Sequence, residues 1–283
     1  MIRLAIQKSG RLNQDSLKLL KDCGISIDNG KDQLKAASRN FPMEVFFLRN
    51  SDIPQYLRDG VVDLAIVGEN LLIEKGINLK VVEELGFSNC RISIAIPKGI
   101  DFRGIEDLNN KRIATSYPNT VNAFLEKNKI RADLHIINGS VEIAPNIGLA
   151  DAICDIVSSG STLFKNNLKE VVKISNSQAV LVQGGSLNSE KIKLINKLRF
   201  RVESVLRAKK SKYILLNTPN DKINAISSIL PVLKSPTILP LAQKGWSSLH
   251  SVINAEDFWD VIDQLKEAGA EDILVCPIEK MVL

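Results

Sequence analysis

The feature that most constrains this chain is the repeated alternation of short apolar runs with segments of helical periodicity. Four of the runs, Ile2–Gln7, Met43–Leu48, Val61–Val67 and Ala152–Val157, are typical of buried β-strands. Continuous apolar strands that alternate with helices are typical of a mainly parallel sheet covered by helices on both faces. The pattern therefore predicts an α/β fold.

The same patterns predict the remaining elements. Strands are expected at 91–96, 112–115, 133–137 and 174–182, and helices at 14–23, 53–58, 121–128 and from Lys165 onward. The 283 residues are 45% hydrophobic and 24% charged, which is enough apolar material for a sizeable core and argues against disorder.

Charge and cysteine usage narrow the class of protein. The formal charge of +5 favours anionic ligands only weakly. The four cysteines form no CxxC pair and only two histidines occur, so a structural zinc site is not expected. The N-terminal MIRLAIQKSGRL is too charged for a signal peptide, and no apolar run approaches the roughly 20 residues needed to span a bilayer. These observations predict a cytoplasmic protein without a membrane partner.

A long helix and a small module follow the alternating region. The helix predicted at 189–210 has an apolar stripe and a basic face, which is typical of a solvated helix at a domain junction. A nucleic-acid-binding role would rest on this helix alone, so no nucleic-acid partner is expected. Residues 211–283 follow the order βαββαβ of the ferredoxin-like motif. Because this module carries no catalytic cluster, we interpret it as a regulatory or assembly domain.

The segment DAICDIVSSGSTL, residues 151–163, combines two carboxylates with a loop of small residues. Asp151 and Asp155 are an even number of residues apart, so an extended chain points both to one side. The following loop, 158–162, exposes hydroxyls and backbone N–H groups in which a phosphate can sit. Carboxylates repel phosphate but suit sugar hydroxyls or a divalent cation. The segment therefore suits a ribose-phosphate site, although a plain strand-to-helix turn with Asp155 as a local cap explains it equally well.

Other polar clusters occur where predicted strands end, as sites in parallel-sheet proteins do. Each cluster alone is more typical of a turn or a cap, but their recurrence favours a common site. Three cations, Lys8, Arg11 and Arg49, would supply positive charge for a polyphosphate.

Several of these segments together resemble one family, ATP phosphoribosyltransferase. The resemblance rests on QKSGRL at 7–12, DGVVDLAIVGENLL at 59–72, KRIATSYP at 111–118, NGSVEIAP at 138–145 and DAICDIVSSGSTL at 151–163. PTILPLA at 236–242 and the closing ILVCPIEKMV extend it into the small module. The chain therefore resembles the long form of the family over essentially its whole length.

The resemblance implies a reaction and a fold. Adenine N1 of ATP attacks C1 of the ribose in phosphoribosyl pyrophosphate (PRPP), with Mg²⁺ on the pyrophosphate, in the first step of histidine biosynthesis. It implies a two-lobed core like that of periplasmic binding proteins, with the site in the cleft. It also implies a C-terminal ferredoxin-like domain that binds histidine for feedback inhibition, and assembly into dimers to hexamers.

The resemblance also assigns residues. Asp151 and Asp155 would hold the ribose hydroxyls, and the 5′-phosphate would lie in the loop of Ser158, Ser159, Gly160, Ser161 and Thr162. Phosphates of ATP or PRPP would meet Lys8, Arg11 and Arg49. From their positions at strand ends we also expect Asp63, Glu69 and Glu142 in the cleft. Thr237, within the PTILPLA match, is the one residue expected to contact histidine, although a plain hydroxyl at the start of a strand explains it equally well.

The expected organisation is a first lobe of residues 1–90 and 175–210, a second lobe of 91–174 with the PRPP motif, and a regulatory domain of 211–283. Two alternatives to the enzyme are a protein that only binds a small anion and an inactive regulatory subunit of the same fold. The intact acidic pair and phosphate loop argue against the inactive subunit.

Overall fold

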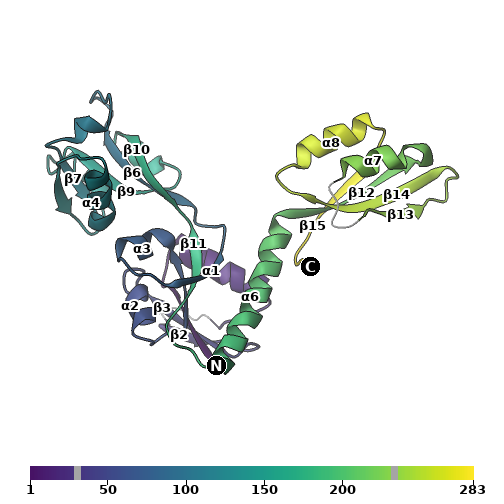
Figure 1. The fold of residues 1–283 in the computed structure, drawn as a ribbon, viewed down its shortest axis with the longest axis horizontal. Coiled ribbons are helices and arrows are strands. Elements are labelled where there is room, and N and C mark those ends of the chain that lie inside the picture. The colour runs from purple at the N-terminus through teal and green to yellow at the C-terminus, as the bar shows by residue number, and fades with distance from the viewer. Residues whose placement is uncertain (29–32, 231–234) are drawn as a thin grey trace. The chain divides into compact units, whose positions relative to one another are not determined.

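The computed structural model describes residues 1–28, 33–230 and 235–283. The chain divides into two compact units (Figure 1). Unit 1 comprises Met1–Lys21 with Ile25–Asn196, and unit 2 comprises Asp22–Gly24 with Lys197–Leu283. Each unit has its own sheets and its own buried apolar clusters.

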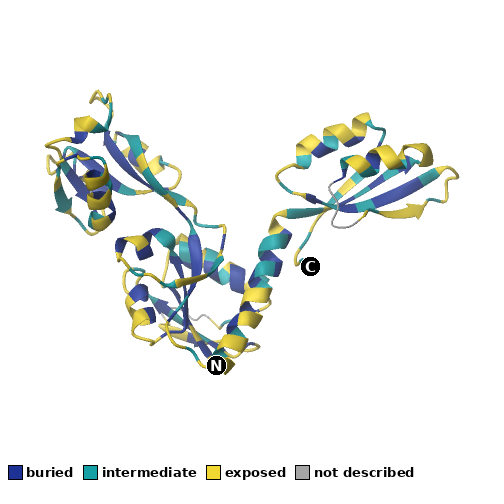
Figure 2. Cartoon of the chain, in the orientation of Figure 1, coloured by how far each residue is buried: buried dark blue, intermediate teal, exposed yellow. Residues whose placement is uncertain are grey.

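The first lobe of unit 1 is built on a six-stranded sheet of order β2-β3-β1-β4-β11-β5. Its strands are β1 Ile2–Gln7, β2 Lys35–Ala37, β3 Met43–Leu48, β4 Leu64–Gly68, β5 Lys80–Glu84 and β11 Ala179–Gln183, and its helices are α1 Arg11–Asp22, α2 Ile53–Arg58 and α3 Glu69–Glu74. Strand β1 lies parallel to β3 and β4. Three consecutive apolar positions of β1, residues 4–6, and four of β4, residues 64–67, are buried, which explains why these strands form continuous apolar runs in the sequence (Figure 2).

The second lobe has a five-stranded sheet of order β10-β6-β9-β7-β8. Its strands are β6 Cys90–Pro97, β7 Arg112–Thr115, β8 Asp133–Ile136, β9 Ala152–Val157 and β10 Leu168–Ser177; its helices are α4 Pro118–Lys127 and α5 Ser161–Lys165, with 3₁₀ turns η1 Ile105–Leu108 and η2 Val141–Ile143. The central strand β9 is parallel to β7 and antiparallel to β6. Residues Ala152 and Cys154 of β9 face one apolar cluster and Ile153 and Val157 the other, so β9 is covered on both sides.

Two predicted elements were wrong. The single strand expected at 174–182 is two strands, β10 and β11, which lie in different sheets and are separated by Gln178. The helix expected from Lys165 is absent, because α5 ends there and Asn167 takes up a left-handed φ of 56°. The alternation that begins at Leu168 belongs to a strand.

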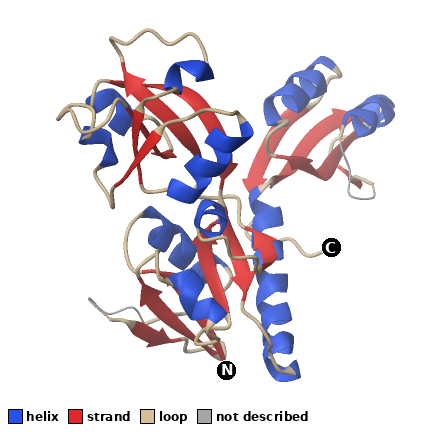
Figure 3. Ribbon diagram, turned by 60° about the vertical axis from the view of Figure 1, so that its left-hand side comes forward, coloured by secondary structure: helices blue, strands red, loops and turns tan. Residues whose placement is uncertain are grey.

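The chain passes between the two sheets of unit 1 twice, between β5 and β6 and again between β10 and β11 (Figure 3). Both sheets contain antiparallel neighbours and are mixed. The expectation of mainly parallel sheets holds only for β3, β1 and β4 of the first sheet and for β9, β7 and β8 of the second. The α/β class and the two-lobed core are confirmed, whereas the exact domain boundaries stay a prediction.

Unit 2 contains the βαββαβ module, which is also confirmed. Its elements are β12 Ser211–Pro219, η3 Asn220–Lys222, α7 Ile223–Ile229, β13 Thr237–Pro240, β14 Trp246–Asn254, α8 Phe258–Glu267 and β15 Glu271–Pro277. The antiparallel sheet has the order β13-β14-β12-β15. Its core is centred on Ile214, Leu216 and Leu249 of the sheet with Ile226 and Leu265 of the two helices.

Helix α6, Ser189–Lys209, is the long helix predicted before the module. Its apolar stripe is buried at Ile195, Leu198, Val202 and Val205. Within the described residues, no helix has both the length and the apolar character that crossing a membrane requires.

Candidate functional site

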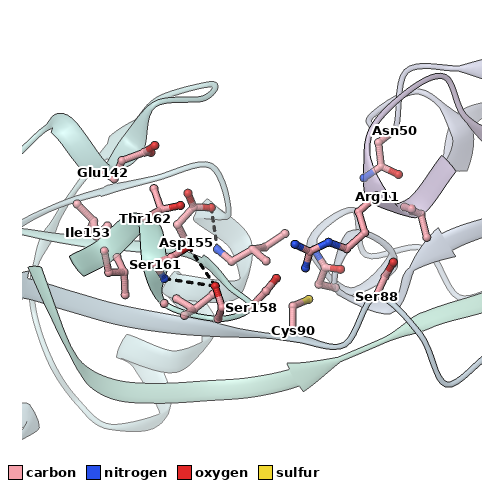
Figure 4. Close-up of a pocket in the computed structure, with 18 of the residues that line it drawn as sticks. Arg11, Asn50, Ser88, Cys90, Glu142, Ile153, Asp155, Ser158, Ser161 and Thr162 are labelled. Atoms are coloured by element: carbon pink, nitrogen blue, oxygen red, sulfur yellow. Dashed lines mark hydrogen bonds between the residues drawn. The ribbon is translucent and has the colours of Figure 1, made fainter. Parts of the chain in front are cut away.

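A cavity of about 520 Å³ lies between the two lobes of unit 1 (Figure 4). One wall is formed by residues at the strand ends of the first lobe, the floor by residues of the β5–β6 crossing, and the other wall by the end of β9 and the loop after it. The principal polar residues are Gln7, Arg11, Asn50, Asn70, Ser88, Cys90, Glu142, Asp155, Ser158, Ser159, Ser161 and Thr162. The cavity therefore lies beyond the carboxyl ends of β1 and β9, where parallel-sheet proteins commonly bind their ligands.

The loop after β9, residues 158–162, forms one edge of the cavity. Gly160 has a φ of +78°, a left-handed conformation that glycine adopts without strain. The four hydroxyl residues of the loop are exposed, and the Ser159 hydroxyl donates to the Ser161 hydroxyl over 3.1 Å. Leu163 is buried in the core behind the loop and anchors it. The loop thus presents hydroxyl and amide groups to the cavity on a fixed support, an arrangement that suits an anion.

Asp155 is half-buried at the carboxyl end of β9 and lines the cavity. Burial raises the pKa of this carboxyl group, and the nearby charge of Glu142 raises it further, although a hydrogen bond from the Ile156 N–H opposes the shift. Two carboxylates that face one cavity repel each other. Hydroxyl donors or a cation between them would relieve that repulsion.

Arg11 and Asn50 approach from the first-lobe wall. Figure 4 shows the Arg11 guanidinium directed across the cavity toward the loop and Asp155. Within the described part of the chain, the buried Oδ1 of Asn50 has no hydrogen-bond partner. A buried acceptor without a donor costs free energy, so an N–H group of a ligand that reaches Asn50 would be favoured.

Asn70 joins the cavity to the crossing between the lobes. Its Oδ1 accepts a hydrogen bond from the Ser177 hydroxyl at 2.9 Å, and its Nδ2 donates to the Tyr117 hydroxyl at 3.3 Å. Burial, together with the charge of Asp155, raises the pKa of Tyr117 far above its ordinary value, so this phenol stays protonated. Residues of both lobes are therefore tied together directly beside the cavity.

The structure does not place all predicted site residues in this cavity. Asp151 is paired with Arg112, whose Nη2 and Nε lie 2.9 and 3.2 Å from its two carboxylate oxygens and whose backbone N–H lies 3.0 Å away. These bonds lower the pKa of Asp151 to about 2. Asp151 and Asp155 lie at opposite ends of β9, about 13 Å apart along an extended chain, and of the two only Asp155 lines the cavity.

Asp63 is also elsewhere. It is 2% exposed at the amino end of β4, where it accepts hydrogen bonds from the Arg3 backbone N–H and from Lys191 Nζ, each at 2.8 Å. The cavity lies at the opposite, carboxyl ends of these strands. Asp63 instead links the start of β4 to Arg3 of β1 and to Lys191 of α6.

Lys8, Arg49 and Glu69 are neighbours of lining residues and do not line the cavity themselves. Lys8 and Arg49 are exposed and directly follow the paired residues Gln7 and Leu48. The lining residues to which the sequence interpretation assigned no role include three neighbours of predicted residues, Gln7, Asn50 and Asn70, and also Ser88 and Cys90 of the β5–β6 crossing. Neighbouring side chains point in different directions, so a polar cluster at a strand end marks the place but not which side chain faces the ligand.

Thr237 begins β13 in unit 2 and is exposed, opposite His250 on β14. The Tyr213 hydroxyl lies 2.6 Å from Nδ1 of His250. The expected contact of Thr237 with histidine stays a prediction.

Comparisons with known proteins cover the whole chain. A family model described as ATP phosphoribosyltransferase matches residues 49–204, and one described as HisG, C-terminal domain, matches residues 208–280. Proteins named ATP phosphoribosyltransferase from Cytophaga hutchinsonii and Phocaeicola vulgatus are 55% and 50% identical over 282 and 283 residues, covering all of this chain and 99% and 100% of theirs.

A solved structure agrees with the sequence matches. It is titled the ATP phosphoribosyl transferase (HisG:HisZ) complex from Thermotoga maritima. It is 30% identical with a TM-score of 0.61, and the match covers 72% of this chain and 99% of that chain.

Proposed function

Because the chain belongs to the ATP phosphoribosyltransferase family, we propose that the cavity between the lobes of unit 1 is where it joins the phosphoribosyl group of PRPP to N1 of ATP. In this reaction the bond from adenine N1 to ribose C1 forms, the bond from C1 to the pyrophosphate oxygen breaks, and pyrophosphate leaves. The observation that carries the proposal is the loop 158–162 and Asp155 on one wall facing Arg11 on the other.

The loop binds the 5′-phosphate of PRPP and Asp155 binds the ribose hydroxyls. The exposed hydroxyls of the loop and its backbone N–H groups donate hydrogen bonds, and the absence of large side chains leaves room for a phosphate. As pyrophosphate leaves, the ribose gains oxocarbenium character, which the negative charge of Asp155 stabilises. Asp151 and Asp63 have no place in this site, because their carboxylates are already paired elsewhere.

The opposite wall receives the anionic and adenine groups. Arg11 contacts a phosphate of ATP or PRPP, and the exposed Lys8 and Arg49, which are next to the lining residues Gln7 and Asn50, add positive charge. The free Oδ1 of Asn50 suits the exocyclic amine of adenine, which is a hydrogen-bond donor. Holding two large anions with N1 facing C1 is the main task of the site.

Mg²⁺ fits this site as a partner of the substrate. Within the described residues no group of three or more His, Cys, Asp or Glu is assembled to hold a metal ion. Mg²⁺ usually needs only one or two carboxylates together with substrate phosphates, and Asp155 and Glu142 both line the cavity. When bound, the ion would neutralise charge on the departing pyrophosphate.

Regulation and assembly belong to unit 2 in this proposal. The βαββαβ module, which matches the family's C-terminal domain, binds histidine as a feedback inhibitor, and Thr237 is a candidate contact. The chain assembles with copies of itself into dimers to hexamers. A cytoplasmic location is supported by four cysteines that are all free thiols.

An absorbance assay with ATP, PRPP and Mg²⁺, with and without histidine, tests the proposal, because alkylation of N1 changes the absorbance of adenine. We expect a signal that requires both substrates, that Asp155→Asn and Arg11→Ala reduce, and that histidine suppresses. A signal that both variants leave unchanged would place the chemistry outside this cavity. Folded protein that binds PRPP without turnover would instead indicate a protein that only binds an anion.

A further inference from the structure

Arg91 connects three segments of the second lobe at the point where the phosphate loop begins. It is the second residue of strand β6, directly after the β5–β6 crossing. Its Nη1 donates a hydrogen bond to the carbonyl oxygen of Ser158 at 3.0 Å. Its Nε and Nη2 donate to the two carboxylate oxygens of Glu170 on β10. One planar guanidinium therefore holds a neighbouring strand and the first residue of the loop at the same time.

Glu170 is itself held in position. The Ser93 hydroxyl, which is buried, donates to its Oε1 at 2.7 Å. The hydrogen bonds from Arg91 lower the pKa of Glu170, so the pair is ionised at neutral pH. In the strand register Ser93 is opposite Asp155 and Arg91 is opposite Val157. The network therefore runs alongside the last residues of β9, up to the loop.

We propose that Arg91 and Glu170 are positioning residues that hold the loop 158–162 in its phosphate-binding conformation, an inference that rests on the function proposed for that loop. Arg91 does not line the cavity, and Glu170 balances its charge. It therefore acts through the geometry it imposes on Ser158, where the chain leaves β9. A lysine keeps the charge but has no planar fork, so it cannot hold the carboxylate and the carbonyl together.

Arg112 offers a matched control. It makes the same kind of contacts at the opposite end of β9, with a bidentate pair to Asp151 and a bond from Nη1 to the Gly148 carbonyl at 3.0 Å. The two arginines thus anchor the two ends of one strand, and only Arg91 contacts the loop. Arg91→Lys and Arg112→Lys change the same chemistry in the same lobe.

The test is steady-state kinetics of the full-length protein with each substrate varied in turn, together with melting temperatures. For Arg91→Lys we expect KM for PRPP to rise about tenfold, because a charge-assisted hydrogen bond that orders the loop is lost, while KM for ATP and kcat change less than about twofold. Glu170→Gln keeps one acceptor for Arg91 and should raise KM for PRPP about threefold. Arg112→Lys should leave both KM values within about twofold.

An unchanged KM for PRPP in Arg91→Lys, or an equal rise in Arg112→Lys, would overturn the positioning role. If Arg91→Lys does not fold, Glu170→Gln decides by the same criterion. Asp155→Asn in the same assay separates this inference from the proposed function. Loss of turnover in Asp155→Asn with a normal KM in Arg91→Lys refutes only the inference, whereas normal turnover in Asp155→Asn refutes the assignment of the site.

Discussion

At the scale of single residues, the two aspartates of DAICDIVSSGSTL have opposite electrostatic environments. Burial raises the pKa of Asp155, whereas the hydrogen bonds of Arg112 lower the pKa of Asp151. A carboxylate that is disfavoured by its surroundings gains most from a ligand, and one that already has a charged partner stabilises the fold. The environment of each carboxylate therefore separates a ligand-binding role from a structural one.

Asp155→Asn should lower turnover about 100-fold without destabilising the free protein. Because the folded pKa of Asp155 is raised above that of an unfolded carboxyl, its ionised form costs stability at pH 7, and an amide removes that cost. The measurements are kcat and the free energy of unfolding. A parallel fall of both quantities would mean that Asp155 is a structural residue.

Asp151→Asn should change how the free energy of unfolding depends on pH. The folded pKa of Asp151 is about 2, below its ordinary value of 3.8, so its contribution to stability is present above about pH 4 and is lost as the pH falls toward 2. The variant should be less stable than the wild type at pH 7. The difference in their free energies of unfolding should be smaller at pH 2.5. Urea unfolding at both pH values checks this, and a difference that is independent of pH would contradict it.

At the scale of elements, the N-terminus of helix α4 is capped by a side-chain carboxylate of helix α3. Glu74, at the end of α3, is 6% exposed and accepts hydrogen bonds from the backbone N–H groups of Asn119 and Thr120 at 3.0 and 2.9 Å, and from the Thr120 hydroxyl at 2.7 Å. A negative charge at a helix N-terminus satisfies orphan donors and complements the dipole. Because α3 and α4 belong to different lobes, this cap also links the two walls of the cleft.

Glu74→Ala should reduce the free energy of unfolding of unit 1 by about 2 kcal/mol, since the buried N–H and hydroxyl of Thr120 and the part-buried N–H of Asn119 lose their acceptor. Glu126→Ala, at the exposed end of the same helix, is the control and should change stability by no more than about 0.5 kcal/mol. Denaturant unfolding measures both variants. Equal effects of the two substitutions would show that the cap contributes nothing specific.

At the scale of the whole molecule, the cavity and the βαββαβ module belong to different units with separate cores. The proposed catalytic residues all lie in unit 1, and the proposed effector contact lies in unit 2. This separation predicts that regulation can be removed without removing the residues of the cleft.

Deletion of residues 211–283 should therefore abolish inhibition by histidine while PRPP still binds to unit 1. The deletion retains α6, whose Lys209 pairs with Asp22 at 3.0 Å. Calorimetric titration with PRPP and with histidine measures the two sites separately. Histidine binding that survives the deletion would place the effector site outside the module.

The local pattern of the sequence was enough to predict much of the fold. The bounds of β1, β3, α2 and β9 agree with the predicted ranges, because each is a strongly periodic segment between clear breaks. The division of 168–183 into β10 and β11 was not predictable in the same way. A strand keeps its local alternation when it leaves one sheet for another, and only the partner strands reveal the change.

What the sequence by itself determined is the chemistry of each segment: the small hydroxyl loop at 158–162, the carboxylates beside it, and the family pattern of motifs. The tertiary structure alone decided which of these groups share a cavity. It brings Arg11 to the loop and Asp155, and it pairs Asp151 with Arg112 and Asp63 with Lys191. The physical reason is that a carboxylate has the same chemistry everywhere along the chain, but only folding determines whether it meets an arginine, a lysine or an open cleft.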